Sequence, residues 1–91
     1  MREWLRSLSA AERKIIGEDI KTAQFGWPLG MPLVRKLAPQ LWEVRSALPN
    51  RIARVLFTRK GEEMVLLHGF IKKTQRTPAA DIRLAKSRID F

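Results

Sequence analysis

Two arginines and a pair of lysines in the second half of the chain are the side chains that first suggest chemistry. Arg45 ends the string LWEVR, and Arg54 interrupts the otherwise apolar string IARVLF. Lys72 and Lys73 follow directly on MVLLHGFI. Guanidinium and ammonium groups bind phosphate oxygens, and the planar guanidinium binds two of them at once. If these four side chains share one surface, they form a cation cluster suited to a phosphodiester.

Such a cluster can cleave RNA without a metal ion, because the 2′-hydroxyl of RNA is itself the nucleophile. Arginines would stabilise the charge on the phosphorane oxygens, and a lysine would move a proton. The expected product carries a 2′,3′-cyclic phosphate, and DNA is not a substrate because it lacks the hydroxyl. The candidate catalytic residues are Arg45, Arg54, Lys72 and Lys73. The further candidates for contacts with RNA are Arg51, Arg76 and His68.

Arg54 and His68 also have interpretations that need no RNA. Arg54 would satisfy its charge equally well at the rim of a sheet or in an ion pair with Glu43. A histidine within a strand is more often packed or hydrogen-bonded than catalytic, so we retain His68 only as a candidate acid.

The residues needed for metal binding, disulfide formation or acyl transfer are not present in the sequence in their usual patterns. The chain has one histidine, no cysteine and no HExxH-like spacing, so we expect neither a metal site nor a disulfide. Glycine-rich phosphate loops and GxSxG-like elbows are absent too. We therefore expect no cofactor and no acyl transfer.

The net charge of +9 favours a polyanionic partner. Residues 1–44 carry 7 basic and 5 acidic side chains, whereas residues 45–91 carry 11 and 4. The second half should therefore hold the anion-binding surface. Charge alone is equally compatible with a small basic protein of another kind.

The first elements that must position these residues are helical. Ser9 and Glu12 have the spacing of a capping box, which predicts a helix from about Ala10 to Gln24. A short helix from Glu3 to Ser7 should precede it and complete a helical hairpin. The string FGWPLGMP cannot continue a helix and indicates a connection.

From Val34 the pattern changes to short strands. LWEVR, RIARVLFT and MVLLHGFI are separated by turn-like residues and predict a three-stranded antiparallel meander. Alternation places Glu43 and Arg45 on one face of the strand and Trp42 and Val44 on the other. We expect the polar pair, Glu43 and Arg45, to point away from the core.

A last helix is expected from Pro78 to Ile89, with Thr77 as its N-cap and Ile82, Ala85 and Ile89 as its apolar face. Residues 1–91 thus form one domain of the α+β class. No apolar run approaches the length of a membrane span, and we expect the chain to stay in the cytoplasm.

The strings KLAPQLWEVR, NRIARVLF and LLHGFIKKTQRTP, together with QFGWPLGMPLVRKL, resemble the HigB-like, phage-derived toxins of the RelE/ParE superfamily. The resemblance covers nearly the whole chain. It implies a RelE-like fold and the toxin of a type II toxin–antitoxin pair that cleaves mRNA on the ribosome. The implied partner is an antitoxin with a helix-turn-helix DNA-binding domain. Arg45 and Arg54 match basic catalytic residues of the RelE-like nucleases, and Lys72 or Lys73 matches another.

Three features depart from that family pattern. One is that the only histidine, His68, lies within a strand. The chain has no tyrosine, whereas several relatives place one near the C-terminus. Relatives also generally begin with a β-strand ahead of the segment that here starts at Arg2. A missing strand would leave a sheet edge unpaired and favour a homodimer or a toxin–antitoxin hetero-oligomer.

Three functions therefore stay open at the level of the sequence. They are a ribosome-associated endoribonuclease, a ParE-like inhibitor of DNA gyrase, and a non-catalytic basic module that binds nucleic acid. The first is favoured by the cation cluster.

Overall fold

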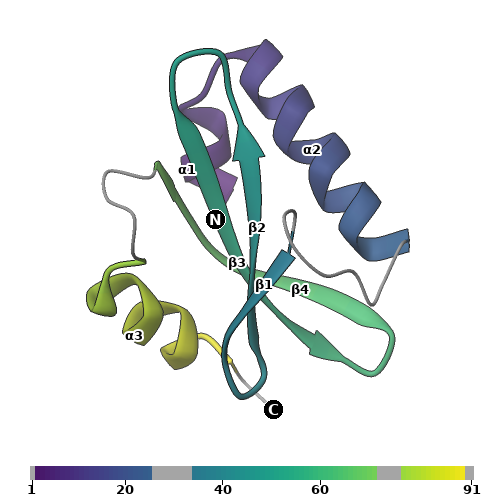
Figure 1. The fold of residues 1–91 in the computed structure, drawn as a ribbon, viewed down its shortest axis with the longest axis vertical. Coiled ribbons are helices and arrows are strands. Elements are labelled where there is room, and N and C mark those ends of the chain that lie inside the picture. Colours follow the sequence, from purple (N-terminus) through teal and green to yellow (C-terminus); the bar gives the residue numbers. More distant parts are fainter. Residues whose placement is uncertain (1, 26–33, 72–76, 90–91) are drawn as a thin grey trace.

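One antiparallel sheet with helices on both faces forms the body of the molecule in the computed structural model (Figure 1). The structure describes residues 2–25, 34–71 and 77–89. The helices are α1 (Arg2–Arg6), α2 (Ala10–Phe25) and α3 (Ala79–Ser87). The strands are β1 (Val34–Ala38), β2 (Leu41–Ala47), β3 (Ile52–Lys60) and β4 (Glu63–Ile71). The predicted α+β class, with helices first and a helix last, is confirmed.

The sheet has four strands in the order β1-β2-β3-β4, so the prediction of three strands was wrong. The additional strand is β1, which pairs with β2 after a turn in which Gln40 adopts a φ of 62°. β1 has only five residues, and two of them are basic. So short a segment shows too few alternations to be recognised from its pattern. The first element among the described residues is α1, which begins at Arg2.

The helical hairpin forms as predicted, and its capping box is present. The backbone amide of Glu12 donates to Ser9 Oγ at 3.1 Å, and the amide of Ser9 donates to Glu12 Oε1 at 3.2 Å. These bonds satisfy two amides that the first turn of α2 leaves without helical partners. α2 therefore begins at the predicted residue and ends one residue beyond the predicted end.

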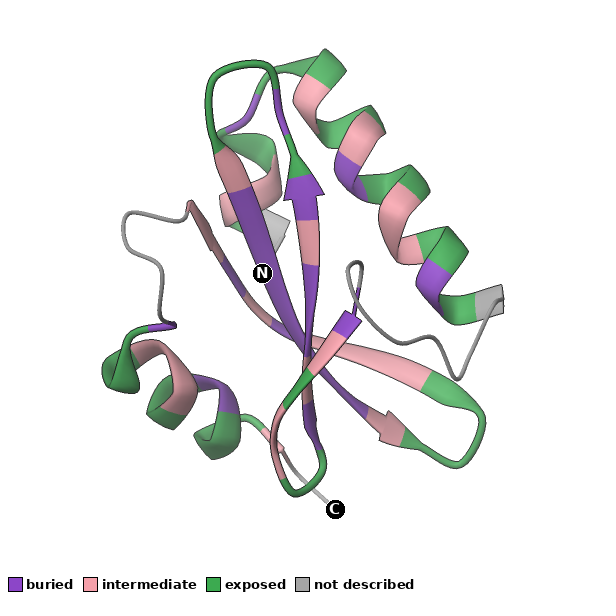
Figure 2. Cartoon of the chain, viewed as in Figure 1, coloured by how far each residue is buried: buried purple, intermediate pink, exposed green. Residues whose placement is uncertain are grey.

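Each face of the sheet has its own core, because successive residues of a strand point to opposite faces. On one face, α1 and α2 cover Val44, Val55 and Phe57. On the other face, Leu41, Leu56 and Leu67 pack against Ala85 of α3. The central strands β2 and β3 are accordingly buried along most of their length (Figure 2).

None of the helices in the described ranges is long and apolar enough to cross a membrane.

Substitution of two glycines by alanine should change the stability of the protein in opposite directions. A Cβ on Gly69 of β4 would lie 2.3 Å from a ring carbon of Trp4, whereas a Cβ on Gly17 of α2 would meet nothing within 4 Å. Gly69→Ala should destabilise the protein by about 1–3 kcal/mol through overpacking. Gly17→Ala should stabilise it by up to about 1 kcal/mol through helix propensity. Urea unfolding of both variants checks this. A midpoint of Gly69→Ala at or above that of wild type would contradict the packing of Trp4 on β4.

Candidate nucleic-acid interface

The strand register brings the predicted arginines together on the face of the sheet that carries α3, which we call the α3 face. Arg45 on β2 lies directly opposite Arg54 on β3, and Arg54 lies opposite Phe70 on β4. Arg35 on β1 lies opposite Glu43 on β2, in the neighbouring row. Because directly opposed residues share a face, all five side chains start from the α3 face.

Arg54 is buried and ion-paired. Its side chain is 2% exposed, and its Nη1 lies 2.9 Å from Oε1 of Glu43, which is fully buried. The same nitrogen donates to Glu43 Oε2 at 3.1 Å. One of the two interpretations of Arg54 that need no RNA, an ion pair with Glu43, is therefore confirmed. The expectation that Glu43 points away from the core was wrong, because this face carries a second core under α3.

Thr77 completes this buried cluster. Arg54 Nη1 donates to Thr77 Oγ1 at 2.7 Å, and the Thr77 hydroxyl donates to Glu43 Oε2. Thr77 was predicted as the N-cap of the last helix, which was wrong: Pro78 is the cap residue, and it makes no side-chain capping bond. A buried carboxylate offers a hydroxyl a stronger bond than an exposed amide does. We call Glu43, Arg54 and Thr77 the buried triad.

Arg45 differs from Arg54 in its surroundings. Its side chain is partly exposed, and none of the described residues forms an ion pair or hydrogen bond with it. The same holds for Arg35, which also lines a cavity of about 430 Å³ between β1 and the start of α3. The triad's arginine and glutamate cancel each other's charge. Arg45 and Arg35 are thus two strand cations of the α3 face that have no ion-pair partner among the described residues and can bind an anion.

His68 has a structural role. Its Nε2 lies 2.7 Å from Oδ1 of Asp81, which joins β4 to α3. Its ring stacks on Phe70 at a centroid distance of 5.6 Å. The hydrogen-bonded histidine that the sequence favoured is therefore present. Acid catalysis by Nε2 would require that the bond to Asp81 be broken.

Arg51 lies apart from the α3 face. It donates from Nε to Glu12 Oε2 at 2.9 Å and from Nη2 to Oε1 at 3.0 Å. This bidentate pair fastens the turn between β2 and β3 to the first turn of α2. The hydrogen bond from Arg51, followed by the one from the Ser9 amide, lowers the pKa of Glu12 below its ordinary value.

The other sequence-predicted cations, Lys72, Lys73 and Arg76, lie outside the described residues. Within the ranges that are described, no three His, Asp or Glu side chains gather as metal ligands would.

Sequence reasoning missed Arg35, Asp81 and the role of Thr77. Arg35 was missed because β1 was not recognised, and its register with Glu43 follows only from that strand. Asp81 occupies the first turn of α3, where a carboxylate is explained by the helix dipole alone. Nothing local distinguishes Thr77 from a helix cap, because its partners lie 23 and 34 residues away in the chain.

The buried triad predicts strong coupling between its two charges. Arg54→Met and Glu43→Leu should each destabilise the protein by about 3–5 kcal/mol, because each leaves the other charge buried without its ion-pair partner. The double variant should be more stable than either single variant. A double-mutant cycle in urea measures this coupling. Costs that simply add would show that the two charges do not depend on each other.

Glu12 predicts a pH-dependent contribution to stability. Because its pKa is lower in the folded than in the unfolded state, the contribution is fully present above the ordinary glutamate pKa. It is lost as the pH falls through the lowered value. Wild type should therefore be more stable than Glu12→Gln at neutral pH, and the difference should shrink in acid. The exposed Glu18→Gln variant is the matched control, and a difference that grows in acid would contradict the pairing.

Comparison with protein families places this arrangement in a known group. Residues 3–90 match the model of the family described as phage derived protein Gp49-like (DUF891). The match spans every strand and almost all of the helical residues. No curated protein matches the chain. The chain belongs to the phage-derived Gp49-like family, a toxin-like family of the RelE/HigB-type superfamily.

Proposed function

We propose that the protein is the toxin of a type II toxin–antitoxin pair and, as a HigB-like member of its superfamily, a metal-independent endoribonuclease that cleaves mRNA on the ribosome. The toxin-like family supports the first part. The observation that carries the second part is the placement of Arg45 beside the buried triad. Arg45 has no ion-pair partner among the described residues, and it lies directly opposite Arg54, whose ion pair with Glu43 joins β2 to β3.

The two arginines have different tasks in this proposal. Arg45 binds a non-bridging oxygen of the scissile phosphate, and Arg35 binds a flanking phosphate. Arg54 is a positioning residue, because its Nη1 is engaged by Glu43 and Thr77. Arg54 holds β3 in place beside Arg45 of β2, and it contributes little net charge because Glu43 neutralises it. Preorganised donors of this kind stabilise developing charge without the cost of reorienting water.

The cleavage itself is a transesterification. The 2′-oxygen forms a bond to phosphorus, and the bond from phosphorus to the 5′-oxygen of the next nucleotide breaks. The 2′-hydroxyl loses its proton to a base, and the leaving 5′-oxygen gains one from an acid. Lys72 and Lys73 are the proposed proton carriers on the grounds of sequence. Arg76 is proposed to bind RNA, whereas Arg51 would have to exchange Glu12 for a phosphate.

The proposed partners follow from the same toxin assignment. A helix-turn-helix antitoxin neutralises the protein, and ribosome-bound mRNA is its substrate. The net charge of +9 favours contact with both an RNA surface and an acidic protein segment.

Arg45→Ala tests the proposal in cells and in vitro. Wild type should arrest growth and cleave translated transcripts to products with 2′,3′-cyclic phosphates. The variant should lose cleavage by about 100-fold or more while keeping its stability, since a charge-stabilising donor is removed. Arg83→Ala, at an exposed position on α3, is the matched control and should cleave as wild type does.

Growth arrest with every transcript intact would contradict the nuclease. Altered DNA supercoiling would then indicate a ParE-like inhibitor. Salt-sensitive RNA binding without products would indicate a non-catalytic module.

A further inference from the structure

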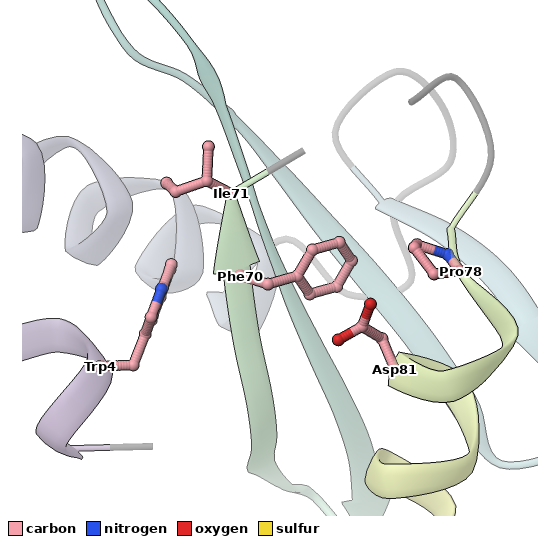
Figure 3. Close-up of a pocket in the computed structure, with 5 residues that line it drawn as sticks. All are labelled: Trp4, Phe70, Ile71, Pro78 and Asp81. Atoms are coloured by element: carbon pink, nitrogen blue, oxygen red, sulfur yellow. The ribbon is translucent and has the colours of Figure 1, made fainter. Parts of the chain in front are cut away.

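A cavity of about 360 Å³ is lined by aromatic and apolar side chains and by one carboxylate. Phe70 and Ile71 line it from β4, Trp4 lines it from α1, and Pro78 and Asp81 line it from the α3 side (Figure 3). We call it the Asp81 pocket. Its volume lies within the range of small-molecule sites, roughly 300–1,000 Å³. Walls of this kind suit a flat ligand that presents hydrogen-bond donors along one edge.

His68 holds the ring of Phe70 and the carboxylate of Asp81 in place. Its own ring stacks on Phe70, with an angle of 24° between the two planes. Its Nε2 donates to Asp81 Oδ1 at 2.7 Å, because a carboxylate only accepts hydrogen bonds. The side chain of Asp81 remains 25% exposed, and none of the described residues forms a hydrogen bond with its Oδ2. The pocket thus offers a fixed acceptor to a ligand.

One row of residues across the sheet connects this pocket with Arg45. Arg45 on β2 lies opposite Arg54 on β3, and Arg54 lies opposite Phe70 on β4. Neighbouring strands are about 4.8 Å apart, so the backbones of Arg45 and Phe70 are roughly 10 Å apart. A single nucleotide reaches across such a distance from its phosphate to its base. A nucleotide whose phosphate is bound by Arg45 therefore has its base within reach of the pocket.

We infer that the Asp81 pocket binds one unstacked guanine of the RNA, beside the phosphate bound by Arg45. Proteins recognise bases of single-stranded RNA by stacking them on aromatic side chains and by hydrogen bonds to their Watson–Crick edges. A carboxylate selects an edge that presents donors. Guanine presents N1–H and N2–H next to each other, so one donates to Asp81 Oδ2 and the other to the remaining lone pair of Oδ1.

The other three bases present a poorer edge to a carboxylate. Adenine and cytosine each carry a ring-nitrogen acceptor beside the amino group, and uracil carries a carbonyl on each side of its N3–H. An acceptor of each base would therefore face a carboxylate oxygen, which repels it. The inference rests on the proposed function in taking RNA as the ligand, and it goes further by naming the base and the residue that selects it.

Nucleoside 3′-monophosphates test the base preference without cleavage, because they contain no phosphodiester bond. In an NMR titration of the labelled full chain, guanosine 3′-monophosphate should shift the backbone amides of Phe70 and Asp81 and the indole N–H of Trp4. It should bind about ten-fold more tightly than its adenosine, cytidine and uridine counterparts, as a bidentate contact does. Inosine 3′-monophosphate keeps N1–H but lacks the 2-amino group, and it should bind several-fold more weakly than the guanosine compound.

Asp81→Asn keeps the shape of the side chain but replaces one acceptor by a donor. An amide matches adenine, which presents an amino donor beside its N1 acceptor. The variant should lose about ten-fold or more of its affinity for the guanosine compound and gain affinity for the adenosine compound. Glu18→Gln, exposed on α2, also removes one negative charge and is the matched control. It should keep the base preference of wild type.

His68 acts in this inference as a positioning residue. His68→Gln keeps a donor for the carboxylate of Asp81, whereas His68→Leu does not. His68→Leu should therefore reduce the ratio of guanosine to adenosine affinity, and His68→Gln should retain most of that ratio. A purely structural role of His68 would instead weaken the binding of all four nucleotides by the same factor.

Three results would overturn the inference. They are equal affinities of wild type for the four nucleotides, unshifted amides of Phe70 and Asp81 at saturating nucleotide, and an unchanged guanosine preference in Asp81→Asn. If that variant does not fold, the comparison of guanosine with inosine on wild type still decides. Base preference without any RNA cleavage would leave the pocket standing and reject the nuclease, whereas cleavage without base preference would do the reverse.

Discussion

The buried ion pair between Arg54 and Glu43 is the constraint on which the functional face depends. Both charges lie on the central strands, where water does not reach them, so neither is tolerable without the other. Thr77 joins them from the segment that leads into α3. A single cluster thus fixes the relation of β2 to β3 and anchors the start of the last helix against the sheet.

This constraint also divides the arginines of the α3 face into two kinds. Arg54 is held in place and electrically balanced by Glu43, while Arg45 stands directly opposite it with no partner among the described residues. A rigid, neutralised neighbour makes a good support for a cation that must meet a phosphate.

The features that could be predicted from the sequence are those set by near neighbours. The capping box at Ser9 and Glu12 located α2 to within one residue. The shared face of Arg45 and Arg54 was only a condition of the sequence argument, because it depends on the register between β2 and β3. The misses come from distant contacts. β1 becomes a strand by pairing with β2. The Thr77 hydroxyl binds the carboxylate of Glu43, 34 residues away in the chain, and therefore does not cap α3. Arg51 is occupied by Glu12, 39 residues away, which no local pattern shows.

Arg45 is proposed to bind the scissile phosphate, whereas Arg54 only positions the sheet. The guanidinium signals of the two arginines test this difference most directly. In NMR spectra of the labelled protein, an oligoribonucleotide with its 2′-hydroxyls blocked can be titrated without being cleaved. The Arg45 Nε–H signal should shift and saturate, while the Arg54 signal stays in place because its ion pair with Glu43 persists. A shift of Arg54 with Arg45 unmoved would contradict the assignment of the phosphate to Arg45.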